Sequence, residues 1–411
     1  MADAIRADAL KIVEEAIHAV LPDNAVKRAL EGRKFPGKVY LVAIGKAGWQ
    51  MGAAACECLG DKLEKGIVIT KYGHVKSELP KTVCYEAGHP VPDFNSFKAT
   101  QAAMDMVGTL GRDDTVVLCI SGGGSALFEK PAVGDEELQD MTNQLLACGA
   151  DIVEMNTIRK RLSRVKGGRF AQLCSPAKVL AIVLSDILGD PLDMIASGPA
   201  SPDASTCEDA MAVAAKYKLK LSPAVQWALK RETPKQLDNV ESVVTGSVKE
   251  LARAAADSCR KLGYTPVILT DQLCCQAREA GSFLASIIKT YAGSAKSLAF
   301  IAGGETVVKL TGSGKGGRNQ EIALAAAEGI AGIRNALVFS VGSDGTDGPT
   351  DAAGGIADGT SRKRLEDLGL TVHGVLEDND AYHALEKLGD LIMTGPTGTN
   401  VNDISVALIK A

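Results

Sequence analysis

The chain has 411 residues, of which 46% are hydrophobic and 23% charged. This composition excludes disorder as the main state, and the length suits two domains better than one. The formal net charge is only −5, from 45 Lys and Arg against 50 Asp and Glu, and no long block of one sign occurs, which argues against a nucleic-acid binder.

Helices and apolar strands alternate through the first half of the chain. We expect helices at residues 3–20, about 48–59, about 95–110, 136–147 and about 165–173. We expect strands at residues 38–44, 66–70, 82–85, 115–120 and 179–185. These strands are apolar throughout rather than alternating, which is typical of a parallel sheet with helices on both faces. Residues 201–239 are helical with polar breaks.

The alternation restarts near Asn239. It predicts strands at 242–245, 267–269, 298–301, 306–310, 336–341, near 391–394 and at 405–409, and helices at 248–262, 276–291 and about 319–330. A Gly/Asp-rich loop and short helices follow residue 341. We therefore predict two α/β domains, residues 1–238 and 239–411.

The spacing of the ten cysteines and the residues at the N-terminus both point to the cytoplasm. No C-x-x-C pair occurs, so buried reduced thiols are expected rather than zinc ligands or disulfides. The N-terminus has acidic residues where a signal peptide would be basic and then apolar, and no apolar run is long enough to span a bilayer. We expect a cytoplasmic protein without a membrane partner.

The 43 glycines are unusually many, and much of the excess lies in five clusters next to predicted strands. The clusters are Gly45–Gly48, Ser121–Ser125, Gly303–Thr306, Gly312–Asn319 and Gly342–Gly348. Ligands of open α/β sheets bind at the carboxyl ends of strands, and glycine turns before helices bind anions. A tight turn explains any one cluster equally well, but five of them, several with Lys, Arg or Asp, favour a phosphate ligand.

One cluster matches G-x-G-x-x-G through Gly312, Gly314 and Gly317, which keeps dinucleotide binding open. Lys315 and Arg318 in the same loop suit a polyphosphate better. A Walker A loop is excluded because Lys315 precedes Gly rather than Ser or Thr. The segment 123–127 fails the last position of a nucleophile elbow, so a serine hydrolase is disfavoured.

Acidic residues follow two of the predicted strands. Asp186 and Asp190 come after one strand, and Asp344, Asp347 and Asp351 line the Gly/Pro-rich loop after another. Magnesium prefers one or two carboxylates together with phosphate oxygens, which either set supplies. Capping of turns is the alternative role. For Asp186 and Asp344 the position directly after a buried strand favours function.

The segment 156–169 holds the densest positive charge. If it is one helix, Arg159 and Lys166 share a face and Arg169 lies one turn further on. A solvated helix face is the usual explanation of such a run, but the adjacent Gly167 and Gly168 favour an anionic ligand. The five histidines are scattered without ligand spacing, and we assign none of them a role.

These residues together resemble the glycerate 2-kinases that carry a C-terminal MOFRL domain. The matching segments of the first half are 42–47, 121–126, 156–160, 165–168, 184–186 and 195–199. Those of the second half are 303–306, 316–321, 344–354 and 394–403. The resemblance covers nearly the whole chain.

The resemblance implies an N-terminal Rossmann-like α/β/α domain with a parallel sheet, a C-terminal α/β domain that contains the MOFRL region, and an active site in the cleft between them. It implies transfer of the ATP γ-phosphate to the C2 hydroxyl of D-glycerate, giving 2-phospho-D-glycerate and ADP, with Mg²⁺. By motif, Lys46 and Arg318 are the principal residues of the site. We expect them to neutralise the transferring phosphoryl group.

Further roles follow from the same motifs. We expect glycerate or phosphate oxygens to be bound by Ser121, Gly122, Gly123, Gly124, Ser125, Asn156, Arg159, Lys160, Lys166, Gly316, Gly317 and Asn319. Asp186 is a candidate for the general base or for a magnesium ligand, and the sequence does not separate these roles. The other candidate metal ligands are Asp190, Glu305, Asp344 and Asp347.

Two alternatives stay open. Some relatives are labelled hydroxypyruvate reductase, so an NAD(P)H-dependent reductase is the second hypothesis, although no histidine with an acid partner is evident for hydride chemistry. A non-catalytic sensor of an anionic metabolite is the third. The oligomeric state is undetermined, and a homo-oligomer remains an option.

Overall fold

A computed structural model describes residues 2–411 of the chain, which divide into two compact units. The Lys46 unit comprises Ala25–Leu184 and Asp190–Thr245. The Arg318 unit comprises the residues before Ala25, the short segment Ser185–Gly189 and Gly246–Ala411. Each unit is described by itself.

A six-stranded sheet of order β3-β2-β1-β4-β5-β6 forms the centre of the Lys46 unit. Its strands are β1 (Val39–Ile44), β2 (Leu63–Lys71), β3 (Thr82–Ala87), β4 (Thr115–Ile120), β5 (Lys178–Leu184) and β6 (Val240–Gly246). The pairs from β3 to β5 are all parallel. The strand β4 is buried at every position, so the apolar runs of the sequence reflect burial on both faces.

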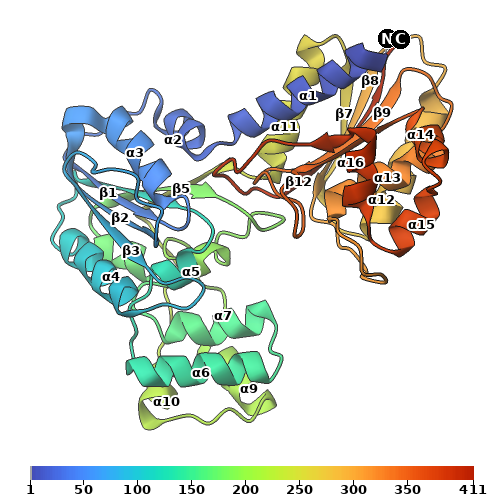
Figure 1. The fold of residues 1–411 in the computed structure, drawn as a ribbon. Coiled ribbons are helices and arrows are strands. Elements are labelled where there is room, and N and C mark those ends of the chain that lie inside the picture. Colours follow the sequence, from blue (N-terminus) through green and yellow to red (C-terminus); the bar gives the residue numbers. More distant parts are fainter. Residues whose placement is uncertain (1) are drawn as a thin grey trace. The chain divides into compact units, whose positions relative to one another are not determined.

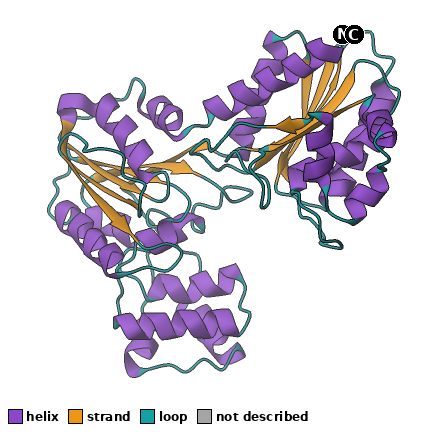
Figure 2. Ribbon diagram, viewed as in Figure 1, coloured by secondary structure: helices purple, strands orange, loops and turns teal. Residues whose placement is uncertain are grey.

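Helices cover both faces of this sheet (Figures 1 and 2). Those packed around it are α2 (Pro22–Leu30), α3 (Gly48–Leu59), α4 (Phe94–Val107), α5 (Gly124–Leu127) and α8 (Arg169–Cys174). A separate group is formed by α6 (Asp135–Ala147), α7 (Ile152–Arg161), α9 (Cys207–Lys216) and α10 (Pro223–Leu229) (Figure 1). This group has a small core of its own, which includes Leu138, Met141, Ile158 and Leu229.

The Arg318 unit has a mixed sheet of order β11-β10-β9-β12-β8-β7. Its strands are β7 (Thr265–Leu273), β8 (Leu298–Gly304), β9 (Ala336–Gly342), β10 (Gly354–Asp358), β11 (Leu391–Ile392) and β12 (Asp403–Ile409). The central strand β12 runs antiparallel to both of its neighbours, β8 and β9. Only the pair β7 and β8 is parallel.

Two helical layers enclose this second sheet. Its helices are α1 (Ala2–Ala19), α11 (Val248–Lys261), α12 (Ala277–Tyr291), α13 (Arg318–Ile330), α14 (Ser361–Asp367), α15 (Val372–Glu377) and α16 (Ala381–Leu388). Alternate residues of β9 serve the two layers: Phe339 packs in the core with α1 and α11, and Val338 packs with α12 and α13. Ion pairs from Arg6 to Asp390 and from Asp8 to Lys410 tie α1 to the C-terminal part of the chain.

Three expected elements differ from the structure. The strand expected at 242–245 belongs to the first sheet, as β6, rather than opening the second series. The helix expected from Val165 begins at Arg169, because Gly167 and Gly168 adopt positive φ angles of 56° and 81°. The strand expected at 306–310 is wrong: the segment forms one isolated bridge, at Val307, and Leu310 is 80% exposed.

The expected domain boundary at 238/239 corresponds to one division of the chain, whereas the observed units divide it at four points. The chain passes between the compact units after Asn24, around the segment Ser185–Gly189, and after Thr245. The last crossing lies seven residues beyond the expected boundary. The other three crossings have no signal in the hydrophobic pattern, because α1 and the segment after β5 reach their partners only through long-range packing.

Candidate functional site

Lys46 stands in the turn between β1 and α3. Gly45 has a φ of 107°, and a Cβ there would lie 2.2 Å from Ser121 Oγ, so only glycine allows the two loops to approach this closely. The backbone of Lys46 is fixed on both sides: its N–H donates to Gly122 O at 2.9 Å, and its carbonyl accepts from Thr70 Oγ1 at 3.2 Å. The Lys46 side chain is exposed, and within residues 2–411 it has no ion-pair partner.

The loop Ser121–Ser125 lies beside Lys46 and leads from β4 into α5. The hydroxyl of Ser121 is buried and occupied, since it donates to Ile44 O and accepts from Ala47 N–H. Gly123 has a φ of 85°, the left-handed conformation that favours glycine. Among the described residues, no hydrogen-bond acceptor binds the backbone N–H of Gly122, Gly123 or Ser125. Three unsatisfied donors next to a lysine suit an anion.

His89 lies against the same loop. A Cβ built on Gly123 would be 3.1 Å from Cδ2 and 3.2 Å from Nε2 of His89, and 3.1 Å from Cγ of Lys46. The imidazole is partly buried. Burial, together with the neighbouring groups Lys46, Lys71 and His74, lowers the pKa of His89 below its ordinary value. No motif or spacing pointed to this residue, because its neighbours come from other parts of the chain.

A buried polar chain supports the far end of the loop. Ser125 Oγ lies 3.0 Å from Ser197 Oγ, and Ser197 Oγ donates to Asn156 Oδ1 at 3.1 Å. Ala196 and Ser197 both adopt positive φ, at 51° and 58°, a conformation that costs non-glycine residues about 1 kcal/mol each. Asn156, an expected ligand residue, thus positions the loop through Ser197.

The expected anion holders of the basic segment are engaged within the protein. Lys166 is fully buried and binds Glu129 Oε2 at 2.7 Å and Ser125 O at 2.8 Å, and burial lowers its pKa. Lys160 is buried and pairs with Asp203 at 3.2 Å. Arg159 is only partly buried, and its NH2 lies 3.4 Å from Ser125 O. Residues 156–169 are not one helix, since α7 ends at Arg161, and of these three expected anion holders only Arg159 keeps an accessible charge.

Arg318 begins α13 and is held by two carboxylates. Its Nε and NH2 bind both oxygens of Asp403 in a bidentate pair, and its NH1 lies 2.9 Å from Glu305 Oε1. Burial opposes the charge, but the carboxylates of Asp403 and Glu305 outweigh it and raise the pKa of Arg318. The guanidinium is therefore always charged, with much of that charge already compensated.

Asn402 joins a residue of the first half to this group. Its Nδ2 donates to Glu305 Oε2 at 3.1 Å and to the carbonyl oxygen of Asp186 at 3.2 Å. The structure therefore brings together three expected residues, Asp186, Glu305 and Arg318, with Asn402 and Asp403, which the sequence reasoning left without a role. The only signal for these two was their place in the last motif of the resemblance.

The N-terminus of α13 is capped from within the protein. Asp347 Oδ2 accepts from Gln320 N at 2.9 Å, and Oδ1 accepts from Asn319 N at 3.1 Å. A Cβ on Gly317 would lie 2.2 Å from the Asp347 carboxyl carbon. Burial, against these N–H donors, raises the pKa of Asp347 to about 7. Gly317 and Asn319 thus belong to a structural cap. The N–H groups of Asn319 and Gln320 already donate to Asp347 and are not available to a ligand.

The N–H groups of the loop with the G-x-G-x-x-G spacing are also bound within the protein. Gly314 N donates to Asp378 O at 2.8 Å, Ser313 N to Asp378 Oδ1 at 3.0 Å, and Lys315 N to Asp380 Oδ1 at 3.0 Å. Gly316 lies against the same segment, since a Cβ built on it would be 3.2 Å from Asn379 O. The glycines let this loop pack on residues 378–380, and its N–H groups are not presented to a pyrophosphate.

The five candidate metal ligands do not form one cluster. Within the described residues, no group of three or more His, Cys, Asp or Glu side chains has the arrangement of a metal site. Asp347 caps α13, and Glu305 pairs with Arg318. Asp344 Oδ1 accepts from Thr346 within its own turn. Asp190 has one buried carboxylate oxygen, Oδ1, without a hydrogen-bond partner.

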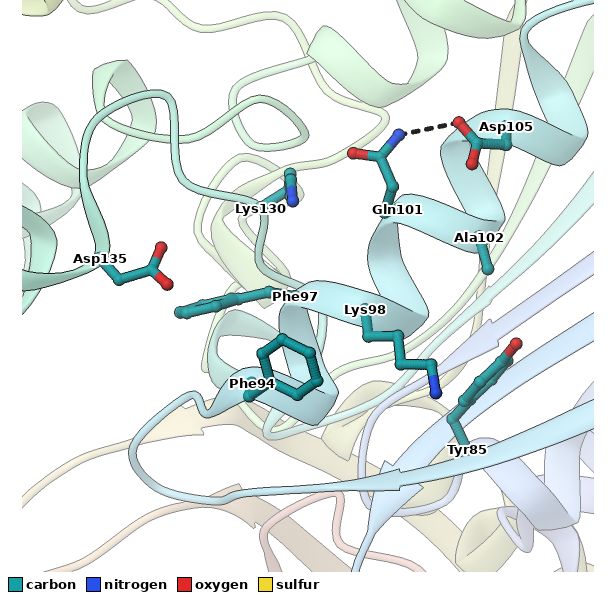
Figure 3. A pocket seen from close by; sticks show the side chains of 9 residues that line it. All are labelled: Tyr85, Phe94, Phe97, Lys98, Gln101, Ala102, Asp105, Lys130 and Asp135. Atoms are coloured by element: carbon teal, nitrogen blue, oxygen red, sulfur yellow. Dashed lines mark hydrogen bonds between the residues drawn. The ribbon is translucent and has the colours of Figure 1, made fainter.

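A pocket of about 410 Å³ lies elsewhere on the Lys46 unit, along α4 (Figure 3). Its lining includes Tyr85, Phe94, Phe97, Lys98 and Lys130. Gln101 and Asp105, on successive turns of α4, also line it and are joined by a hydrogen bond of 2.8 Å (Figure 3). None of the expected site residues lines this pocket.

No helix among the described residues is long and apolar enough to cross a membrane.

The architecture and the two residue groups define a class of two-sheet α/β proteins, and comparison with known proteins identifies the family. Residues 8–230 match a domain of unknown function, DUF4147, and residues 298–403 match the MOFRL family. A protein of Thermotoga maritima named D-glycerate 2-kinase is 50% identical over 99% of both chains. One of Pyrococcus horikoshii named glycerate 2-kinase is 40% identical over 99% of this chain and 98% of its own.

Other relatives and solved structures agree with this match. A protein of Agrobacterium vitis, provisionally named a hydroxypyruvate reductase, is 39% identical over 91% of this chain and all of its own. The crystal structure of a glycerate kinase of T. maritima superposes with a TM-score of 0.94 at 50% identity, covering 99% of this chain and 100% of the other. That of a P. horikoshii protein gives 0.95 at 39% identity, covering 99% of both. The chain belongs to this DUF4147–MOFRL family, which includes the glycerate 2-kinases.

Proposed function

We propose that this protein is a glycerate 2-kinase, which transfers the γ-phosphoryl group of ATP to the C2 hydroxyl of D-glycerate and releases 2-phospho-D-glycerate and ADP. The observation that carries the proposal is the identity of half of all residues, over 99% of both chains, with a protein named D-glycerate 2-kinase. The site residues support it, because phosphoryl transfer requires positioning and charge neutralisation more than covalent chemistry.

In the Lys46 unit, the loop Ser121–Ser125 binds an anionic group of the substrates. The N–H groups of Gly122, Gly123 and Ser125 donate to no acceptor among the described residues, and Lys46 supplies an unpaired positive charge next to them. The buried bonds of Ser121 and the link from Ser125 to Ser197 hold the loop in place. Because these donors are fixed before the reaction, they stabilise developing negative charge without reorganisation.

In the Arg318 unit, the guanidinium contributes a positive charge to the same reaction. Asp403 and Glu305 fix its orientation, and Asn402 fixes Glu305. The bidentate pair prevents the side chain from rotating freely, so the arginine is pre-oriented. Asp186, whose carbonyl oxygen binds Asn402, is the expected residue from the first half of the chain that shares this environment.

Magnesium enters this proposal as part of the nucleotide substrate. The described residues hold no cluster of three metal-ligating side chains, so a resident metal centre built by the protein alone does not fit. Magnesium on a nucleotide needs only one or two carboxylates and neutralises phosphate charge when bound. Asp190 Oδ1 has no hydrogen-bond partner among the described residues and fits such a contact.

The reductase alternative is supported less well. It rested on the G-x-G-x-x-G spacing and on the names of some relatives, and the loop with that spacing uses its N–H groups to bind Asp378 and Asp380. It also follows no regular strand, since residues 306–310 form a single bridge. A dinucleotide fold needs these N–H groups for its pyrophosphate. We further propose a cytoplasmic location, because all ten cysteines are free thiols, as expected in a reducing compartment.

One assay tests the proposed function. Purified protein is incubated with D-glycerate, ATP and Mg²⁺, and the position of the phosphate in the product is read by ³¹P NMR. The expected result is ADP with phosphate on C2. A parallel incubation with hydroxypyruvate and NADH serves as the comparison. NADH oxidation without ADP formation would replace the proposal by the reductase.

A further inference from the structure

The Lys46 group carries one side chain that the proposed function leaves unused. His89 follows β3 and places the Cδ2–Nε2 edge of its imidazole against Gly123, on the loop whose N–H groups are free. The stem of Lys46 touches the same glycine. No hydrogen bond to either ring nitrogen of His89 is formed by any of the described residues. A partly buried imidazole with both nitrogens free is equipped to bind something from outside the protein.

We propose that His89 is the general base of the phosphoryl transfer. This inference rests on the proposed kinase function and adds a residue to it. In the step, neutral His89 accepts the proton of the C2 hydroxyl as that oxygen forms a bond to the γ-phosphorus. The bond from the γ-phosphorus to the bridging oxygen of ADP breaks, ADP leaves with the electron pair, and His89 later returns its proton to water.

The charges around His89 favour this role. Lys46, Lys71 and His74 lie close enough to act on it electrostatically, and Glu86, which accepts from Val75 N–H at 2.9 Å, lies near His74. With burial, these groups favour the neutral imidazole, and a neutral ring is the form that accepts a proton. Bound substrate anions would offset the cations and move the pKa of His89 back toward neutral pH, where a general base is most effective.

Competing bases are less well placed. His74 has one ring nitrogen, Nδ1, 3.0 Å from the carbonyl oxygen of Lys46, so that atom already has a partner. Asp186 is the base that the sequence suggested, and its carbonyl oxygen binds Asn402 in the Arg318 group. Of these three side chains, only that of His89 is among the nearest neighbours of a Cβ built on Gly123.

The test measures kcat and kcat/KM for glycerate from pH 5 to 9 in the wild type, His89→Gln and His373→Gln. His373 is exposed on α15 and serves as the matched control. The expected result is a fall in kcat by about 10²- to 10⁴-fold for His89→Gln, the usual contribution of a general base, with loss of the acid limb of the wild-type profile. His373→Gln keeps both the rate and the limb.

A second variant separates catalysis from folding. In His89→Ala, added imidazole is expected to restore part of the rate, which a merely structural role would not allow. A kcat for His89→Gln within threefold of wild type, an unchanged acid limb, or no rescue by imidazole would overturn the assignment while leaving the kinase in place. A wild type that forms no ADP from ATP with glycerate would instead remove the proposed function and this inference together.

Discussion

Lys46 and Arg318 are cations of one proposed reaction, but their surroundings differ. Lys46 is exposed, has no carboxylate partner among the described residues, and stands beside free backbone donors. Arg318 is partly buried and bound by Asp403 and Glu305. The first arrangement offers net positive charge to a ligand. The second offers a guanidinium of fixed orientation, whose charge is largely compensated by Asp403 and Glu305 before any ligand binds. Similar residues can thus serve catalysis with different consequences for stability.

The largest expected effect separates the two cations. Lys46→Met and Arg318→Ala should each lower kcat by about 10²- to 10³-fold, as loss of one electrostatic donor does. Arg318→Ala should also destabilise the protein by roughly 2 kcal/mol or more, because it leaves Asp403, 5% exposed, without its partner. Lys46→Met should leave the free energy of unfolding within about 0.5 kcal/mol. Steady-state kinetics and urea unfolding measure both quantities.

A double variant sharpens this difference. Adding Asp403→Asn to Arg318→Ala removes the stranded carboxylate and should recover much of the lost stability but none of the rate. Equal unfolding free energies for Lys46→Met and Arg318→Ala would show that the pairing of Arg318 with Asp403 and Glu305 does not stabilise the fold.

The next effect concerns the capped helix of the Arg318 unit. The pKa of Asp347 is raised to about 7 in the folded protein, so the native state binds more protons than the unfolded state between about pH 4 and 7. The stabilisation is complete below the unfolded pKa and is lost as pH rises through 7. From pH 5 to 8.5 the wild type should therefore lose about 2 to 3 kcal/mol through this group.

Asp347→Asn is the control for this pH dependence. Urea unfolding at both pH values should show that the variant lacks this part of the loss. Asparagine also has one oxygen instead of two for the N–H groups of Asn319 and Gln320, so about 1 kcal/mol of the cap is lost at low pH. A wild type and a variant with parallel pH profiles would contradict the raised pKa.

The two glycine loops give a smaller contrast. Gly123→Ala forces alanine to a φ of 85° and crowds Lys46 and His89, so we expect about 1 kcal/mol lower stability and a kcat at least tenfold lower. Gly312→Ala would place a Cβ 2.3 Å from Asp378 and should lower stability while the folded fraction keeps its kcat. Melting temperatures and kinetics of both variants test this. A large loss of kcat in Gly312→Ala would return a ligand role to its loop.

The smallest effect is expected at the pocket along α4. Phe94, 74% exposed in its lining, contacts none of the candidate site residues. Phe94→Ala should change kcat and KM for either substrate by less than twofold. A KM for ATP raised tenfold or more would assign this pocket to the nucleotide.

Much of the fold could be predicted from hydrophobic periodicity, because β1, β4 and β5 are buried on both faces and read as apolar runs. The strand β10 could not, since its Gly354 and Gly355 lack apolar side chains and pair through backbone alone. Residues 306–310 misled for the opposite reason: they are rich in apolar residues yet have no neighbouring strand.

The candidate site could be predicted where motif and position coincide, as at Lys46, the loop Ser121–Ser125 and Arg318. Spacing could not show whether a charge is already paired. Lys160 and Lys166 read as ligand contacts, yet Asp203 and Glu129, far along the chain, neutralise them. His89 is the reverse case, because its neighbours Lys46 and Gly123 are separated from it by other elements.

The four crossings of the chain between its units have a consequence for synthesis. The Lys46 unit ends at Thr245, whereas α1, which precedes it in the chain, packs on α11 and β9 and shares a hydrophobic core with β12. About 390 residues separate α1 from β12, which at 5 to 20 residues per second is roughly 20 to 80 s of translation. During that time the apolar stripe of α1, with Ile5, Ile12 and Ile17, has no native partner from β12. The hydrophobic core that α1 forms in the Arg318 unit is therefore completed only when β12 has been made.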